Sequence, residues 1–198
     1  LAPTAAREFF WLMTALGVIG IIYGALVALR QSNLRKMLAF SSISHVGLVI
    51  VGLAAMNIQG VQGAVLQLAN FSMIAGGLML MAGFLHHRLG STDLASLGGL
   101  ARPLPRLTAL FLLLGMASIG LPGTNGFVAE LLMLLGILQA SPGVAVIALL
   151  GVILGAAYFL GFFQRAFLGP VTQPAVASAM DLRPRELLIA SVMGLLVL

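Results

Sequence analysis

Six long apolar segments constrain the fold of this chain more than any other feature. The hydrocarbon core of a bilayer needs about 20 apolar residues per helix, and inside it every backbone polar group must be bonded internally. Only 8% of the residues are charged, against roughly 25% in soluble domains. The sequence therefore predicts an all-α, polytopic membrane helix bundle with spans near 9–29, 37–56, 61–85, 107–138, 144–163 and 187–198.

We expect these segments to form a single transmembrane domain over residues 1–198. The chain begins at Leu1, and its sixth apolar segment is short. We therefore expect a fragment of a longer membrane protein, with the last span truncated.

The fourth apolar segment contains an internal helix breaker. It is too long for one straight span, and Leu-Pro-Gly-Thr-Asn-Gly occupies positions 121–126. Pro122 has no backbone donor, and Gly123 and Gly126 weaken a helix further. Backbone groups freed at membrane depth must face protein or a wet cavity, and broken helices of this kind often line ion sites. The pattern predicts one broken crossing.

Glu130 is the only acidic residue that lies well inside an apolar segment. A charge at mid-membrane depth costs roughly 2.5–3.5 kcal/mol on insertion scales. Glu130 follows Pro122 by eight residues, or roughly 12 Å of helix. An apolar environment favours the neutral carboxyl group and a nearby cation favours the charged one, so a balanced group can load and release a proton. The alternatives are a structural ion pair or a position near the interface.

His45 lies well inside the second segment. Ser41, Ser42 and His45 fall on one face of a helix. Imidazole titrates near neutral pH and can pass protons between hydroxyl neighbours. The alternative is a neutral histidine that bonds to an adjacent helix.

Four other polar residues have less specific positions. Lys36 and Arg35 begin the second span, where each could take part in proton transfer or extend to the lipid headgroups. Gln67 and Asn70 share a face of the third span, three residues apart. Their amides could hold water in a proton path or simply bond to a neighbouring helix.

The basic residues predict the orientation. Lys and Arg number ten, and with one broken crossing all but Arg7 fall on one side, which the positive-inside rule assigns to the cytoplasm. A re-entrant fourth segment would divide them six to four. The net charge of +5 therefore reflects topology and predicts no nucleic-acid partner. Cysteine is absent, so no cysteine-ligated iron–sulfur cluster forms within these residues, and there is no nucleotide-binding fingerprint.

Two stretches resemble a known family. Residues 31–47, which include His45, are similar to the sequence entering the tenth helix of the antiporter-like subunits of respiratory complex I. Residues 121–130 are similar to the broken twelfth helix in the version carried by subunit M, or chain 4, which has Glu at the position of Glu130. The resemblance implies helices 9–13 and the start of 14, one inverted repeat of the antiporter-like fold. It gives Glu130 the role of proton-exit carboxylate, His45 that of central-axis histidine, and places Lys36 in a basic pair.

The resemblance also implies a function. The parent protein would be a proton-translocating membrane-arm subunit of NADH:quinone oxidoreductase, a translocase with no redox chemistry in this chain. Quinone reduction, NADH, FMN and iron–sulfur clusters would belong to other subunits, and no metal or cofactor would bind here. Its partners would be other membrane-arm subunits, lipid and protons, in a bacterial inner membrane. The alternatives are a Mrp-type cation/proton antiporter, a membrane-bound hydrogenase or related complex, and a structural scaffold.

Three positions depart from the family pattern. Asn33 and Phe40 stand where Asp and Tyr are frequent, and Phe71 stands where a second central histidine is expected. We therefore expect a water held between Gln67 and Asn70 to replace that histidine. Two further groups that the family uses, a Glu–Lys pair and another lysine, would lie upstream of Leu1, so this chain alone would not translocate protons.

Overall fold

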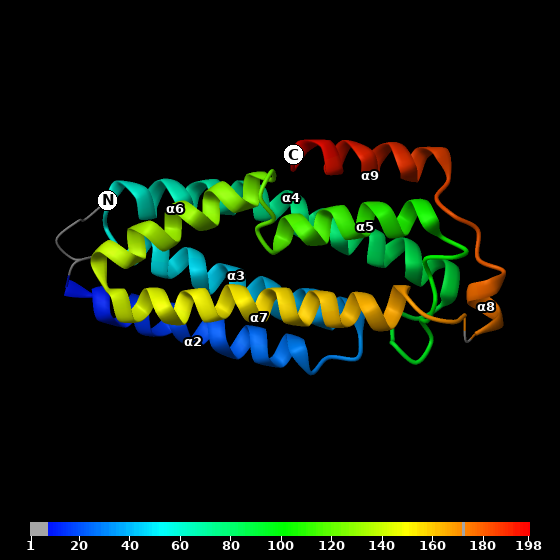
Figure 1. Ribbon diagram of the computed structural model, residues 1–198, viewed down its shortest axis with the longest axis horizontal. Helices are drawn as coiled ribbons and strands as arrows, with labels where there is room; N and C mark the ends of the chain where they lie inside the picture. The colour runs from blue at the N-terminus through cyan, green and yellow to red at the C-terminus, as the bar shows by residue number, and fades with distance from the viewer. Residues whose placement is uncertain (1–7, 172) are drawn as a thin grey trace.

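A computed structural model of the chain describes residues 8–171 and 173–198, so Arg7 lies outside the described residues. The described part is an elongated bundle of helices (Figure 1), and this confirms the predicted all-α class. In chain order the helices are α2 (Phe10–Leu29), α3 (Leu34–Ala54), α4 (Ile58–Leu89), α5 (Pro105–Ser118), α6 (Asn125–Ala140), α7 (Pro142–Phe167), α8 (Pro174–Ala177) and α9 (Pro184–Leu196).

Four helices of the described part, α2, α3, α4 and α7, are long and apolar enough to cross a membrane. With 32 residues, α4 is about 48 Å long and exceeds the roughly 30 Å of a bilayer core. It begins before the predicted limit at residue 61, because the Asn57 side chain accepts a hydrogen bond from the Gly60 N–H at 2.8 Å and caps the helix.

The fourth apolar segment consists of two short helices, α5 and α6, of 14 and 16 residues. They follow one another along the long axis of the bundle, and α7 returns alongside (Figure 1). Helix α5 ends in a Schellman motif: Gly120 has φ +67°, its N–H donates to Ala117 O at 3.3 Å, and Leu121 N–H donates to Met116 O at 3.1 Å. The segment is thus interrupted at the predicted break, between two half-helices that run in the same direction along the bundle.

The position of Gly126 differs from the prediction. We expected Gly126 within the break, but it is the second residue of α6 and is buried. The reason is packing, because a methyl group at this position would clash with the carbonyl oxygen of Ala117 on α5. Gly126 therefore allows the two half-helices to approach closely, whereas Pro122 and Gly123 lie in the break itself.

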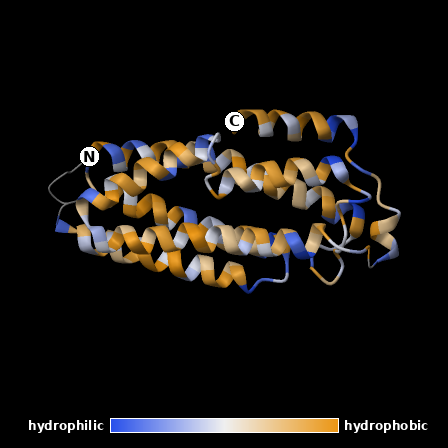
Figure 2. Ribbon diagram, in the orientation of Figure 1, coloured by the Kyte–Doolittle hydropathy of each residue, from blue (hydrophilic) through white to orange (hydrophobic). Residues whose placement is uncertain are grey.

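Stacked phenylalanine rings join α5 to α7. Phe111 on α5 lies 4.7 Å from Phe167, and Phe163 lies 4.8 Å from Phe167, as measured between ring centroids. Phe159 stacks on Phe111 at 5.7 Å. Hydrophobic side chains predominate along the helices (Figure 2). The aromatic stack fixes the half-helix that precedes the break.

The connections that follow α2, α4 and α7 gather at one end of the bundle, on the right of Figure 1. These connections and the helix turns beside them carry the basic residues that the sequence assigned to one side, namely Arg30, Arg35, Lys36, Arg88, Arg102, Arg106, Arg165, Arg183 and Arg185. This end is called the basic end below. Its hydrophilic character is visible in Figure 2.

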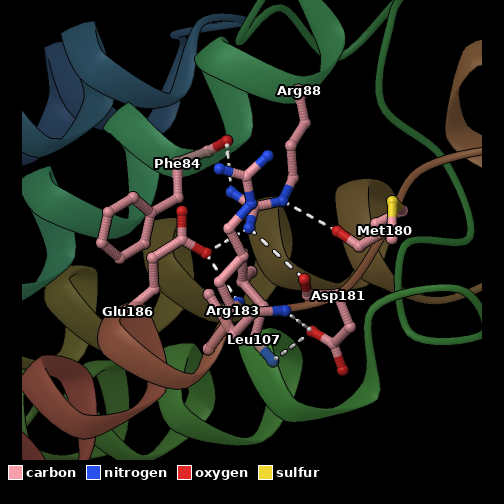
Figure 3. Close-up of polar contacts among 8 residues, drawn as sticks. Phe84, Arg88, Leu107, Met180, Asp181, Arg183 and Glu186 are labelled. Atoms are coloured by element: carbon pink, nitrogen blue, oxygen red, sulfur yellow. Dashed lines mark hydrogen bonds and ion pairs between the residues drawn. The ribbon is translucent and has the colours of Figure 1, made fainter.

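Arg88, in the last turn of α4, connects that helix to the segment before α9 (Figure 3). Its Nε donates to the carbonyl of Met180 at 2.8 Å, and Nη1 donates to the carbonyl of Phe84 at 3.1 Å. Nη2 donates to the Glu186 carboxylate and, at 3.4 Å, to the carbonyl of Asp181. Such shared, charge-assisted bonds orient a helix end well.

Asp181 fixes the start of α5. Its carboxylate accepts the backbone N–H groups of Arg106 at 2.9 Å and Leu107 at 3.2 Å (Figure 3). A carboxylate at a helix N-terminus satisfies unpaired donors and complements the helix dipole. Helix α5 is thus held at its start by Asp181 and along its length by the aromatic stack, which defines where the break begins.

Candidate functional site

A small cavity lies where the end of α5 meets α2, α3, α6 and α7. Its polar lining comes from Ser44 and His45 on α3, Ser118 on α5, Glu130 on α6 and Tyr158 on α7. The space open to the centres of water-sized molecules is about 20 Å³. About 10–15 Å³ of such space accommodates one water. The cavity therefore joins an imidazole, a carboxyl group and hydroxyl groups around room for a water. We call it the central cavity.

Glu130 is only 5% exposed. Side chains of a helix tilt toward its N-terminus, and for Glu130 that direction leads back to the break. Its carboxylate lies beside the backbone of Gly120, so that a methyl group built there would meet the carboxylate first. The break and the buried carboxyl group, which the sequence analysis treated together, are in direct contact.

His45 is buried, at 9% exposed, and its ring packs on the ring of Phe71. Ser44, which the sequence analysis did not select, lines the cavity beside His45 and donates to the carbonyl of Ile21 at 3.0 Å. Ser41 and Ser42, which it did select, do not line this cavity. The sequence analysis thus selected serines on α3, but the serine beside the central cavity is Ser44.

Ser41 and Ser42 line a second, smaller cavity of about 10 Å³. Phe71 also lines it, together with Ser118 and Tyr158. Ser118 and Tyr158 therefore contribute to both cavities. We call this space the serine cavity; it lies toward the basic end, because Ser41 and Ser42 precede His45 along α3.

Tyr158 is the functional candidate that the sequence analysis missed. It is only 4% exposed, and it is one of two tyrosines in the chain, within the apolar run 144–163. A tyrosine inside a membrane span places a hydroxyl group in a dry environment, where it needs a polar partner. That signal was available from the sequence, but the position between two cavities depends on how α7 packs.

Gln67 and Asn70 are buried on α4, at 3% and 8% exposed, and neither lines the two cavities. Within the described residues, Gln67 Oε1 and Asn70 Nδ2 have no hydrogen-bond partner. Gln67 lies one turn from Gly63, which packs against the backbone of Ala129 and Met133 on α6. Buried polar atoms of this kind need a partner, and water is a common one.

Lys36 is exposed in the first turn of α3, at the basic end, and it lines neither cavity. Its N–H donates to Asn33 Oδ1 at 3.2 Å, and Asn33 Nδ2 donates to Asp93 Oδ1 at 2.9 Å. An aspartate at position 33 would face Asp93 with like charge. The amide at this position is therefore matched to Asp93.

Within residues 8–171 and 173–198, no group of three or more His, Asp or Glu side chains is arranged to hold a metal ion. The carboxyl, imidazole and hydroxyl groups that line the central cavity are of the kinds that can exchange protons with water.

Comparisons with known proteins show which proteins this chain is similar to. Subunit M of the NADH-quinone oxidoreductase of Rickettsia conorii is 38% identical over all 198 residues, which correspond to 40% of that protein. Respiratory complex I from Thermus thermophilus contains a chain with a TM-score of 0.93 at 36% identity, matched over 100% of this chain and 41% of that one. A chain of the Mrp complex from Dietzia has a TM-score of 0.80 at 27% identity, with 84% and 31% covered.

The chain thus spans about two-fifths of the length of the curated relatives it matches. The resemblance found in residues 31–47 and 121–130 extends over most of the sequence, since the transmembrane family model matches residues 3–155. The chain belongs to the NADH:quinone oxidoreductase/Mrp antiporter transmembrane family.

Proposed function

We propose that this chain is part of an M-type, proton-translocating subunit in the membrane arm of an NADH:quinone oxidoreductase. The observation that carries the proposal is the central cavity, which joins Glu130 and His45 at the helix break. The relative named subunit M supports the assignment, as does the match to a complex I chain.

In this proposal Glu130 carries the proton. His45 and a water in the central cavity deliver a proton to the Glu130 carboxylate, and the carboxyl group then releases that proton toward the exit side, in the role that the family resemblance implies. The low dielectric of the site strengthens the influence of any charge that arrives nearby, so a change elsewhere in the complex can switch the carboxyl group between its two forms. Gly120 of the break lies against Glu130, whereas residues 121–123 are exposed on this chain. Because freed backbone groups at membrane depth must face protein or a wet cavity, another subunit or water covers them in this proposal.

A route from the basic end follows from the order of the cavities. Lys36 lies at that end of α3, the serine cavity comes next, and Tyr158 with Ser118 leads to the central cavity. Hydroxyl groups of serine and tyrosine both donate and accept hydrogen bonds, so they can pass a proton along a chain that includes water. Lys36 lies at the start of this route, where its charge acts electrostatically on protons that enter the path.

The remaining parts of the proposal concern the surroundings. Other membrane-arm subunits and lipid cover the bundle, which lies in a bacterial inner membrane with the basic end toward the cytoplasm. NADH oxidation and quinone reduction take place in other subunits, and this chain holds no redox cofactor. Proton movement here is coupled to that distant chemistry.

Replacement of Glu130 by Gln in the full-length subunit tests the proposal. Gln keeps the size and the hydrogen bonding and removes the titratable proton. The complex is expected to assemble, and both proton pumping and coupled quinone reduction should fall. Normal pumping in an assembled complex would instead favour a structural scaffold whose polar groups only pack.

The Mrp match makes a cation/proton antiporter the second candidate. It is weaker, at 27% identity against 36% for the complex I chain. The two candidates differ in their energy source. Proton movement that requires NADH and quinone supports the first, and exchange of Na⁺ for protons without NADH supports the second.

A further inference from the structure

Gly120, just after the last residue of α5, lies against the Glu130 carboxylate. A methyl group built on Gly120 would stand 3.1 Å from Glu130 Cδ and 3.7 Å from Oε1, and closer still to Oε2. Real side chains do not approach so closely, so either the carboxylate or the backbone would have to move. Of the two glycines in the break, Gly120 and Gly123, only Gly120 is placed so that a side chain would compete directly with Glu130 for space.

The left-handed backbone conformation of Gly120 explains only in part why a glycine stands at this position. Gly120 has φ +67° at the end of α5, and a helix end of this type commonly has glycine. Gly90 meets the same backbone requirement at the end of α4, with φ +71°, yet a methyl group there would meet nothing within 4 Å. Gly123, in the same break as Gly120, has φ +99° and is equally open. The contact with a carboxylate distinguishes Gly120 from both.

We propose that Gly120 is a positioning residue, which leaves the space in which the Glu130 carboxylate rests against the helix break at the edge of the central cavity. The inference deepens the proposed function, because it concerns the group that we propose carries the proton. Ser118 and Ile119, directly before Gly120, line the central cavity with Glu130. A side chain at position 120 would push the carboxylate out of this corner.

Displacement of the Glu130 carboxylate would slow proton transfer. Proton transfer between Glu130 and a cavity water needs the carboxyl oxygen within hydrogen-bond reach of that water. A misplacement of about 1 Å can reduce a rate by about a hundredfold. A methyl group at Gly120 should therefore act on pumping through the position of Glu130, even where the complex assembles normally.

The test uses the full-length subunit in its native complex, with Gly120→Ala compared with Gly90→Ala and Gly123→Ala. Two quantities are measured on assembled complex: the rate of NADH-driven proton pumping, and the rate at which a hydrophobic carbodiimide labels Glu130, followed by mass spectrometry. Carbodiimide reacts with a protonated carboxyl group that it can reach, so its rate reports the position and surroundings of Glu130 independently of pumping.

We expect Gly120→Ala to lower pumping at least about tenfold and to change the labelling rate of Glu130. Gly90→Ala should leave both within about twofold of the parent, because its methyl group meets open space. Gly123→Ala strains the backbone, but its methyl group does not meet the Glu130 carboxylate. It should therefore lower pumping less than Gly120→Ala does and leave the labelling rate of Glu130 unchanged. Equal effects of Gly120→Ala and Gly123→Ala on both measurements would overturn the proposal.

A rescue variant separates positioning from folding. Shortening the acid in Gly120→Ala/Glu130→Asp gives back about one methylene of space, so the double variant should pump faster than Gly120→Ala and, if that variant does not assemble, should restore assembly. Absence of any rescue, with Glu130→Asp alone active, would assign Gly120 to folding and overturn the proposal. If Glu130→Gln pumps normally, the proposed function fails, and the labelling comparison still decides the role of Gly120.

Discussion

The imidazole of His45 packs against the ring of Phe71, with 4.3 Å between centroids and 32° between planes. By resemblance to the family, position 71 would hold a second central histidine. Phe71 also lines the serine cavity, so it supports His45 on one side and closes a polar space on the other. At position 71 this chain thus has an apolar ring in place of the imidazole that the resemblance implies.

This contact predicts how position 71 responds to replacement. Phe71→His keeps a ring against His45 and adds a second group that can carry a proton. Because we expect the water held between Gln67 and Asn70 to do this already, pumping should stay within about twofold of the parent. Phe71→Ala should lower it, because loss of a packed ring leaves a gap beside His45. Pumping by assembled complex in inverted vesicles provides the measurement. A large gain with Phe71→His would show that no water route bridges this position.

Asn70→Leu should slow proton transfer several-fold without unfolding α4. Asn70 Nδ2 and Gln67 Oε1 are buried without a hydrogen-bond partner among the described residues, and a shared water would satisfy both. Leucine removes one partner of that water and keeps the side-chain volume. Ser72→Ala is a matched control, since the Ser72 hydroxyl bonds only to the Ala69 carbonyl of its own helix, at 2.7 Å. If Asn70→Leu pumps as Ser72→Ala does, the amide pair only packs helices together.

Tyr158→Phe should lower pumping roughly tenfold, because it removes the hydroxyl group between the central and serine cavities while keeping the ring. The second tyrosine of the chain provides the control. Tyr23 is exposed on α2 and lines neither cavity, so Tyr23→Phe should leave pumping unchanged. Equal rates for the two variants would exclude a route through Tyr158.

The Arg88–Glu186 link predicts a dependence of stability on pH. Burial alone would raise the pKa of Glu186, but the hydrogen bonds from Arg88 and from the Arg183 backbone, with the nearby positive charges, bring it below its ordinary value of 4.5. A carboxyl group whose pKa is lower in the folded protein than in the unfolded chain stabilises the folded state while it is ionised. The contribution of Glu186 to stability is therefore complete above about pH 4.5, its ordinary pKa, and declines as pH falls further.

Thermal unfolding of the purified complex, with and without Glu186→Gln, measures how the contribution of the Arg88–Glu186 pair to stability depends on pH. The variant should unfold at a lower temperature at pH 7, and the difference should shrink as pH falls below 4.5. The effect should be small, because Glu186 is partly exposed and solvent screens the pair. A difference that is constant between pH 7 and pH 4 would show that the ion pair does not contribute.

The sequence was enough to predict the features that depend on composition and local chemistry. Apolar runs predicted long helices, Pro122 and Gly123 predicted a broken helix, and Glu130 was conspicuous as a carboxyl group in an apolar stretch. These follow from the cost of burying charge and of losing backbone hydrogen bonds. They need no knowledge of which helices are neighbours, and the family resemblance derived from the same residues is confirmed by the comparisons.

Features that depend on helix packing could not be predicted in this way. Gly126 was assigned to the break, although it begins α6 and lies close to Ala117. Tyr158 was passed over, because only the packing of α7 places it between two cavities. Gly120 was not selected either, since its proximity to Glu130 arises from the way the two half-helices meet.

The rate of proton pumping by complex that contains Glu130→Gln tests the central claim most directly. The measurement compares Glu130→Gln with Glu130→Asp and the parent, in inverted vesicles with NADH as the electron donor and with equal amounts of assembled complex. A proton-carrying carboxyl group predicts a loss of at least about tenfold for Gln and a smaller loss for Asp, which still titrates. Pumping by Glu130→Gln at the parental rate would contradict the claim.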